Sequence, residues 1–348
     1  MKTVSSDTVF VSLRYFYKTY RWAGNRTRFI VKEFQIIEQF FRDKGQQRRD
    51  VHLGIGDDCA IVQPAENKSI AISCDTLVEN IHFLPTMPAH ELGYKSVAVN
   101  LSDLAAMGAD PAWMTLALTL PDVDNQWLQE FSEGLFEAAE YYSVSLIGGD
   151  TTRGPRCINI TIHGQVPTGK ALNRSGAKIG DWIYVTGTLG DSALGLDVLL
   201  GNKEVDLQYK EFLINRHYHP TPRIIAGQAL RSLATSAIDL SDGLNSDIKH
   251  VLKASNVGAI IDVNELPLSK SLLESVGKHE AINYALTGGE DYELLFTVPE
   301  AQRGALDTAL LHAGVKFVKI GQICAGDKLR LVSDGQPFEL DAKNFEHF

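Results

Sequence analysis

Acidic residues recur at the ends of apolar runs, beside Gly, Ser or Thr, and this pattern constrains the fold more than any other feature of the sequence. Asp103 lies in NLSDLAAMGADP, which is rich in small residues and indicates the end of a helix that begins near Ala89. A carboxylate among small apolar residues is costly to desolvate unless positive charge meets it. Similar acids occur in GIGDDCA, SCDTLVENIH, IGGDTTRG, AIDLSDG and TGGEDYELLF. We therefore expect several chain segments to bring acids to one site.

Length and charge limit the class of protein. A chain of 348 residues predicts two domains. The net charge of −10 argues against nucleic acid or an anionic membrane as the main partner, and it is compatible with clustered acids that hold divalent cations. No apolar run reaches the roughly 18 residues of a membrane span, and the four cysteines show no CxxC spacing. We expect a cytoplasmic protein with reduced cysteines.

Three regions are expected along the chain. Residues 1–30 combine basic and aromatic residues and form an extension, which we expect to be poorly ordered and outside the fold rather than a targeting segment or a membrane-surface arm. We expect residues 31–166 to form an N-terminal domain and residues 167–348 to form a C-terminal domain.

The periodicity predicts an α/β (α+β) fold with mixed sheets and helices packed mainly on one face. In the first unit we expect a helix over 31–45 whose apolar positions are Phe34, Ile37 and Phe41, and a strand over 144–149 that stops at Asp150. The second unit is expected to close with a hairpin at Asp334-Gly335. Leu-Ser-Asp occurs at 101–103 and at 240–242, which indicates two related acid turns that face one site.

Other nucleotide and metal motifs fail in detail. Cys59 stands where a dinucleotide fingerprint that starts at Gly54 needs its third glycine. Ala171 removes the hydroxyl that a P-loop over 164–171 needs for Mg²⁺. The histidines show no zinc spacing. Carboxylates on turns suit Mg²⁺ around a polyphosphate, because Mg²⁺ prefers oxygen ligands, and the nearby Arg153, Lys170 and Arg174 would neutralise phosphate charge.

Together these motifs resemble the thiamine-monophosphate kinase family. The resemblance is carried from about residue 31 to the end by GIGDDCA, SCDTLVENIHF, NLSDLAAMGADPAW, LIGGDTTRG, LNRSGAKIGDWIYVTGTLGDSALGL, AIDLSDGL, GGEDYELLF and the closing HF. The family belongs to a superfamily with aminoimidazole ribonucleotide synthetase and selenophosphate synthase. The resemblance implies two α/β domains: one over 31–166 that binds ATP and Mg²⁺ and forms a homodimer through its sheet, and one over 167–348 that completes the active site. It also implies transfer of the ATP γ-phosphoryl group to thiamine monophosphate, which yields thiamine diphosphate and ADP.

The resemblance also implies roles for individual residues. It assigns several Mg²⁺ ions to Asp58, Ser73, Cys74, Asp75, Asp103, Asp150, Asp239 and Asp242. It assigns ATP to Gly149, Asp150, Arg174 and Ser241, and it assigns the thiamine end to His82 and Glu290. The family has Thr where Cys74 stands, so metal ligation there by side chain or by backbone stays open, as does a requirement for K⁺. Ala342 stands where an aromatic residue sometimes occurs, which leaves Phe345 as the candidate to stack on the substrate ring.

The chemistry of this reaction predicts no essential general base. The acceptor is a phosphate oxygen whose second pKa is about 6, so near neutral pH most of the substrate is already a dianion. Mg²⁺ bound by the aspartates, with Arg174, would offset the repulsion between two polyanions. His82 is therefore assigned to positioning the substrate. The alternatives are another ATP-dependent synthetase of the superfamily, and a non-catalytic nucleotide or metal sensor.

Overall fold

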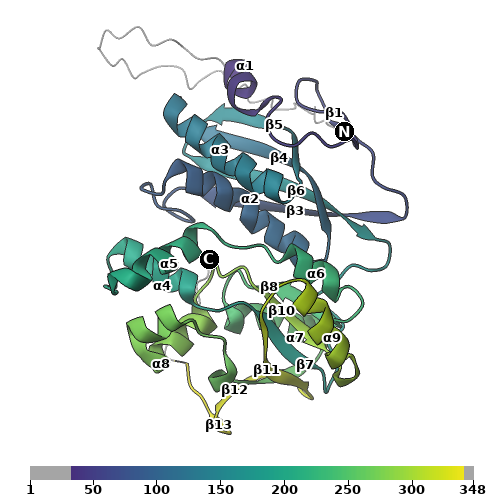
Figure 1. Cartoon of the computed structure of the whole chain (residues 1–348), viewed down its shortest axis with the longest axis vertical. Coiled ribbons are helices and arrows are strands. Elements are labelled where there is room, and N and C mark those ends of the chain that lie inside the picture. The colour runs from purple at the N-terminus through teal and green to yellow at the C-terminus, as the bar shows by residue number, and fades with distance from the viewer. Residues whose placement is uncertain (1–32, 341–348) are drawn as a thin grey trace, which may run out of the picture.

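The computed structural model describes residues 33–340, which form two units stacked along the long axis of the molecule (Figure 1). The expected extension over 1–30 and the candidate Phe345 lie outside these residues. Within the described range, no helix combines the length and the apolar character needed to cross a membrane.

The first unit contains a four-stranded sheet in the order β3-β6-β4-β5, in which β4 and β5 are parallel and the other pairs are antiparallel. Two long helices, α2 and α3, lie across one face of it (Figure 1). The elements of this unit are α1 (Glu33–Ile36), η1 (Ile37–Phe41), β1 (Val51–Leu53), β2 (Ile61–Val62), β3 (Lys68–Val78), α2 (Ala89–Ala106), β4 (Asp110–Leu120), α3 (Asn125–Tyr141), β5 (Ser145–Arg153) and β6 (Cys157–Pro167).

Strand alternation determines which face of this sheet is covered. In β4, Met114, Leu116 and Leu118 are buried in the core formed with α2 and α3, while Thr115 and Ala117 lie on the opposite face. Strand residues alternate between the two faces with period two. The opposite face is covered at Trp113, where Val51 of β1 and Val62 of β2 pack, and its residues are exposed over much of β3. We call it the open face.

Two expected elements differ from the structure. The predicted helix over 31–45 is a short α1 followed by a π-helical turn, and the buried residues are Ile36, Phe40 and Phe41, whereas Phe34 is 78% exposed. The π turn adds a residue per turn and therefore shifts the apolar face. The strand expected to stop before Asp150 continues as β5 to Arg153, because its pairing with β4 continues to that residue.

The second unit contains a seven-stranded sheet in the order β13-β12-β9-β11-β7-β10-β8, in which only the β12–β9 pair is parallel within the described residues. The predicted hairpin at Asp334-Gly335 is confirmed as the β12–β13 turn. The elements are β7 (Trp182–Thr186), α4 (Asp191–Leu200), α5 (Leu207–Tyr218), α6 (Ile224–Leu230), β8 (Ser236–Asp239), α7 (Leu244–Ser255), β9 (Gly258–Asp262), η2 (Val263–Glu265), α8 (Lys270–Thr287), β10 (Leu294–Val298), η3 (Glu300–Gln302), α9 (Arg303–His312), β11 (Phe317–Cys324), β12 (Leu329–Ser333) and β13 (Gln336–Pro337).

The largest apolar core among the described residues crosses the boundary between the units. It joins the α2–α3 core to α6, α9 and one face of β7 and β10, where Tyr184 and Phe296 lie. The other face of β7, with Ile183 and Val185, packs with α7 and α8 in a second core. The boundary is therefore packed with apolar side chains, which gives α2 a fixed position against the second unit. The predicted mixed α/β class is confirmed.

Helices α2 and α3 cross with their backbones in contact. A Cβ atom at Gly134 would lie 1.9 Å from the carbonyl oxygen of His90, and one at Gly93 would lie 2.1 Å from that of Phe131. Glycine permits this approach because it has no side chain. Any larger residue at either position would push the helices apart and displace α2.

We expect Gly134→Ala to lower the free energy of unfolding by about 2 kcal/mol or more, because the added methyl group overpacks a backbone contact. Gly304→Ala is the matched control, because Gly304 lies in α9 and a methyl group added there would meet no neighbouring atom within 4 Å. Alanine there should be neutral or stabilising by up to about 1 kcal/mol. Urea unfolding of both variants measures the difference, and equal stabilities would contradict the close crossing.

Candidate active site

Three carboxylates from both units meet where α2 lies against the second unit. Asp75 projects from β3, Asp103 from α2, and Asp239 ends β8. The Ser73 hydroxyl donates a hydrogen bond to Asp103 Oδ2 (2.5 Å), and the Ser102 hydroxyl donates one to Asp239 Oδ2 (2.8 Å). The second bond joins the two units directly. We call Asp75, Asp103 and Asp239 the acid cluster.

Each member of the acid cluster resists ionisation. Burial, with the charges of Asp103 and Asp239, raises the pKa of Asp75 to about 7. Burial and the charge of Asp103 raise the pKa of Asp239 to about 6. Burial also raises the pKa of Asp103, although the Ser73 hydroxyl and Arg174 oppose this. The positive charge of Arg174 is thus too small to compensate three clustered carboxylates, and a site of this kind favours added cations.

The segment after β8, a turn followed by the start of α7, adds two further acids. Asp242 is exposed in this turn, and its backbone N–H donates to Asp247 Oδ2 at 3.0 Å. Burial raises the pKa of Asp247 to about 7; the Asp242 N–H opposes this shift, while the charges of Asp242 and Asp239 add to it. Asp247 was not predicted from the sequence, although its position five residues after Asp242, in the first turn of α7, was a usable signal.

A cavity of about 480 Å³ opens beside the acid cluster. Ser73, Asp103 and Asp239 line it, together with Asn173 and Arg174 from the segment that precedes β7. The structure thus brings Arg174 to the acids, as predicted for a phosphate-binding residue. Of the two Leu-Ser-Asp segments predicted to be related turns, the first lies within α2 and only the second forms a turn. Ser102 of the first segment bonds to Asp239, which directly precedes the second.

Other predicted site residues lie elsewhere. Asp58, Gly149 and Asp150 line a separate cavity of about 870 Å³, between the loop over 54–60 and strands β4 and β5. Cys74 lies on the open face, where its sulfur accepts a hydrogen bond from the Asn159 amide (3.2 Å). Its neighbours Ser73 and Asp75 project from the opposite face of β3, so the Cys74 side chain points away from the acid cluster.

The predicted thiamine residues lie at the same boundary between units. Glu290 follows α8, and its backbone N–H donates to the carbonyl of Ser241 at 2.8 Å, beside the acid turn. His82 follows β3, and its Nδ1 accepts a hydrogen bond from the Val78 N–H at 3.1 Å. Neutral His82 therefore carries its proton on Nε2. The lone pair that a general base needs is already engaged, which agrees with a positioning role.

No preformed cage for a metal ion exists among residues 33–340: no three His, Cys, Asp or Glu side chains there could hold one ion. The donor chemistry nevertheless fits Mg²⁺, which in phosphoryl-transfer sites takes one or two carboxylates and completes its shell with phosphate oxygens and water. The carboxylates of the acid cluster supply such donors, and their raised pKa values show that a cation would relieve their repulsion.

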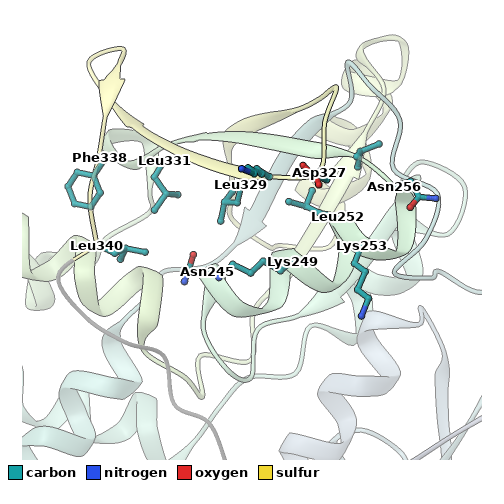
Figure 2. Close-up of a pocket in the computed structure, with 12 residues that line it drawn as sticks. Asn245, Lys249, Leu252, Lys253, Asn256, Asp327, Leu329, Leu331, Phe338 and Leu340 are labelled. Atoms are coloured by element: carbon teal, nitrogen blue, oxygen red, sulfur yellow. The ribbon is translucent and has the colours of Figure 1, made fainter.

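A third cavity, of about 740 Å³, lies in the second unit between α7 and β12 (Figure 2). Leu252, Leu329 and Leu331 form its apolar wall, and Lys249 and Lys253 lie along its helical side. None of the described site residues predicted above lines it. We therefore place the chemistry at the acid cluster and not here.

Comparisons with known proteins identify the family of the chain. Family models described as "AIR synthase related protein, N-terminal domain" and "AIR synthase related protein, C-terminal domain" match residues 56–166 and 178–334. The thiamine-monophosphate kinase of Escherichia coli K12 is 58% identical over 318 residues, which cover 91% of this chain and 98% of the relative. That of Haemophilus influenzae is 48% identical over 321 residues, with the same coverage of both chains.

Solved structures show the same likeness. The crystal structure of thiamine-monophosphate kinase from Stenotrophomonas maltophilia K279a superposes with a TM-score of 0.78 at 43% identity, and covers 84% of this chain and 93% of that chain. A structure described as AaThiL complexed with AMPPCP and TMP superposes with a TM-score of 0.73 at 33% identity, and covers 82% of this chain and 89% of that chain.

We expect Asp75→Asn to stabilise the metal-free protein at pH 8. The folded-state pKa of Asp75 is raised to about 7, far above that of an unfolded aspartate. Its protonated form therefore favours folding; this contribution is complete below about pH 4 and is lost as the pH rises through about 7. Removing the carboxylate should raise the melting temperature by roughly 2–6 °C at pH 8 and by little at pH 4.

Calorimetry in a chelator measures this difference, with Asp122→Asn as the control because Asp122 is exposed in the loop before α3. If Asp75→Asn were as stable as the control at pH 8, the Asp75 carboxylate would not be under electrostatic strain.

Proposed function

The chain belongs to the thiamine-monophosphate kinase family, and from this premise we infer that it transfers the γ-phosphoryl group of ATP to thiamine monophosphate, forming thiamine diphosphate and ADP. The structural observation that carries the proposal is the acid cluster, where carboxylates from both units meet beside Arg174. Phosphoryl transfer depends mainly on alignment and on charge neutralisation, and both can be supplied by such a site.

We propose that Mg²⁺ ions and ATP bind around these acids. When bound, Mg²⁺ neutralises and orients phosphate oxygens. Asp75, Asp103, Asp239 and Asp242 would hold the ions at the cluster, with Ser73 orienting Asp103 through its hydrogen bond. Asp58 and Asp150 line the cavity of about 870 Å³, away from the acid cluster, so we assign them to separate ions. If Cys74 takes part, it does so through its backbone, because its sulfur lies on the open face.

The remaining assignments concern the two substrates. Arg174 would stabilise the charge that develops on the transferred group, and Gly149 and Ser241 would contact ATP. The acceptor phosphate needs no base because it is already largely deprotonated near neutral pH. His82 and Glu290 would position the thiamine end, whose cationic ring suits an acidic pocket. Phe345 stays a prediction, as does any requirement for K⁺.

Asp239→Asn and Asp242→Asn should each lower kcat/KM by about 100-fold or more, because each removes charge directed at Mg²⁺-ATP and removes little packing. The assay is formation of thiamine diphosphate from ATP, Mg²⁺ and thiamine monophosphate. Asp327→Asn is the matched control, since Asp327 is exposed in the second unit beside the third cavity (Figure 2). Near-normal turnover by both site variants at saturating Mg²⁺ would contradict the assignment.

We also propose that the chain is a cytoplasmic homodimer whose copies meet through the open face. All four cysteines are free, which agrees with a reducing compartment. The open face exposes apolar residues of β3, and Ile72 is 63% exposed there. Exposed apolar patches on a sheet are characteristic of interaction surfaces.

Ile72→Lys should convert the dimer into a monomer, because it places a charge in the centre of the proposed apolar contact. Ile225→Lys is the matched control: Ile225 is 62% exposed but lies on α6 in the second unit. Light scattering coupled to gel filtration measures the mass of each variant. A dimer that persists in Ile72→Lys, or that Ile225→Lys dissociates instead, would place the interface elsewhere.

A further inference from the structure

Lys95 is a fully buried lysine in the middle of α2. Its relative exposure is 0%, and it lies among Val97, Ala98 and other buried residues of that helix. Lysine is almost never fully buried unless its charge is paired, because desolvating an ammonium group is costly. It was not predicted from the sequence, since a lysine in a helix is normally expected on the side that faces solvent.

The Lys95 ammonium closes a triangle with two groups of the second unit. Its Nζ lies 3.1 Å from Glu290 Oε1 and 3.4 Å from His217 Nε2, and His217 Nδ1 lies 3.3 Å from Glu290 Oε2. Lys95 comes from α2, His217 from α5 and Glu290 from the loop after α8. Both carboxylate oxygens of Glu290 thus contact a nitrogen, one from each side of the boundary between the units.

The geometry fixes the protonation of this triangle. An ammonium group can only donate hydrogen bonds, so His217 Nε2 must accept and the imidazole proton lies on Nδ1. Nδ1 lies 3.2 Å from the Ser192 hydroxyl oxygen and 3.3 Å from Glu290 Oε2. Burial and the Lys95 charge lower the pKa of His217 to about 4, which keeps the ring neutral. Burial alone would raise the pKa of Glu290, but Lys95, His217 and His82 together outweigh burial and hold that pKa below its usual value. Glu290 is therefore a fixed carboxylate.

The loop that carries Glu290 is strained and fixed on both sides. Glu290 and Tyr292 have φ values of 65° and 50°, a region that side chains other than glycine rarely adopt. Their backbone N–H groups bond to the carbonyls of Ser241 and Leu240, beside the acid cluster. Next in the chain, the buried Glu293 accepts two hydrogen bonds from Arg223, at 2.5 and 2.6 Å. These hydrogen bonds fix the backbone of the loop, and the contacts with Lys95 and His217 fix the Glu290 carboxylate.

We propose that Lys95 is a positioning residue for the acceptor substrate: together with His217 it orients the Glu290 carboxylate toward thiamine monophosphate and couples the thiamine end to the relative placement of the two units. This inference rests on the proposed function, which assigns Glu290 to the thiamine end. The Glu290 side chain is 25% exposed, so a substrate can reach it while both carboxylate oxygens contact nitrogen atoms. The charged or titratable groups that act on Glu290 are Lys95, His217 and His82.

Lys95→Met tests the proposal, because methionine is similar in length and carries no charge. We expect binding of thiamine monophosphate, measured by calorimetry, to weaken about 10-fold at pH 8, since breaking one partner of a buried charge pair leaves the other unpaired. Binding of an ATP analogue with Mg²⁺ should change less than about 2-fold. The ratio of the variant Kd to the wild-type Kd should rise further toward pH 6, because in the variant, without the Lys95 charge, the Glu290–His217 pair takes up a proton. Titration of the substrate phosphate affects both proteins equally and cancels in this ratio.

A double-mutant cycle separates positioning from general damage. Adding Lys95→Met to Glu290→Gln should change the affinity for thiamine monophosphate less than about 2-fold, because the carboxylate on which Lys95 acts is already gone. His217→Leu, which keeps the ammonium–carboxylate pair, should weaken binding about 3-fold and serves as the second variant if Lys95→Met does not fold. Arg231→Met is the matched control, since Arg231 pairs with Asp110 across the same boundary away from Glu290.

Equal losses of nucleotide and thiamine monophosphate affinity in Lys95→Met would overturn the proposal, as would a pH-independent ratio or a further large loss in the Glu290→Gln background. The same loss in Arg231→Met would also overturn it, because the effect would then follow from any broken contact between the units. Turnover by the wild type is measured separately. If the wild type bound thiamine monophosphate but did not phosphorylate it, the proposed function would be contradicted, while the double-mutant cycle of binding affinities would still test the role of Lys95.

Discussion

The repulsion among the carboxylates of Asp75, Asp103 and Asp239 is the interaction on which the site depends. These groups come from three elements and two units, and they stay close because the Ser102 hydroxyl bonds to Asp239 and the apolar core continues across the boundary. Folding tolerates this arrangement because burial and the neighbouring charges raise the pKa values of these carboxylates, so that protons can neutralise them when no cation is bound. A site that is unfavourable when empty gains affinity for the cations that relieve it.

Helix α2 connects the acid cluster to the rest of the molecule. Its C-terminal half carries Ser102 and Asp103, and about two turns earlier it carries Lys95, which reaches Glu290 in the second unit. The glycine contact with α3 fixes its position on the first sheet. One rigid element thus positions both ends of the proposed site, the acid cluster for the phosphates and Glu290 for the thiamine end, as expected for groups that must be aligned for in-line transfer.

The sequence allowed the fold class and all three residues of the acid cluster to be predicted, because alternating strands and acids beside small residues are local signals. The π-helical turn after Ile36 was not predictable, since it depends on how Phe40 and Phe41 pack. Lys95 and Asp247 were missed because their meaning comes from partners distant in the chain or from burial. The sequence also did not predict that Asp58 and Asp150 line a different cavity from Asp103, because a motif does not show on which side of a sheet its residues lie.

The most direct test of the central claim is the number of protons released when Mg²⁺ binds together with a non-hydrolysable ATP analogue. Calorimetric titrations at pH 6.5 in two buffers of different ionisation enthalpy give this number. Carboxylates with pKa values near 6 to 7 are partly protonated at that pH, so wild-type protein should release about one proton more than Asp75→Asn. Identical proton release by the two proteins would contradict a metal site built on mutually repelling acids.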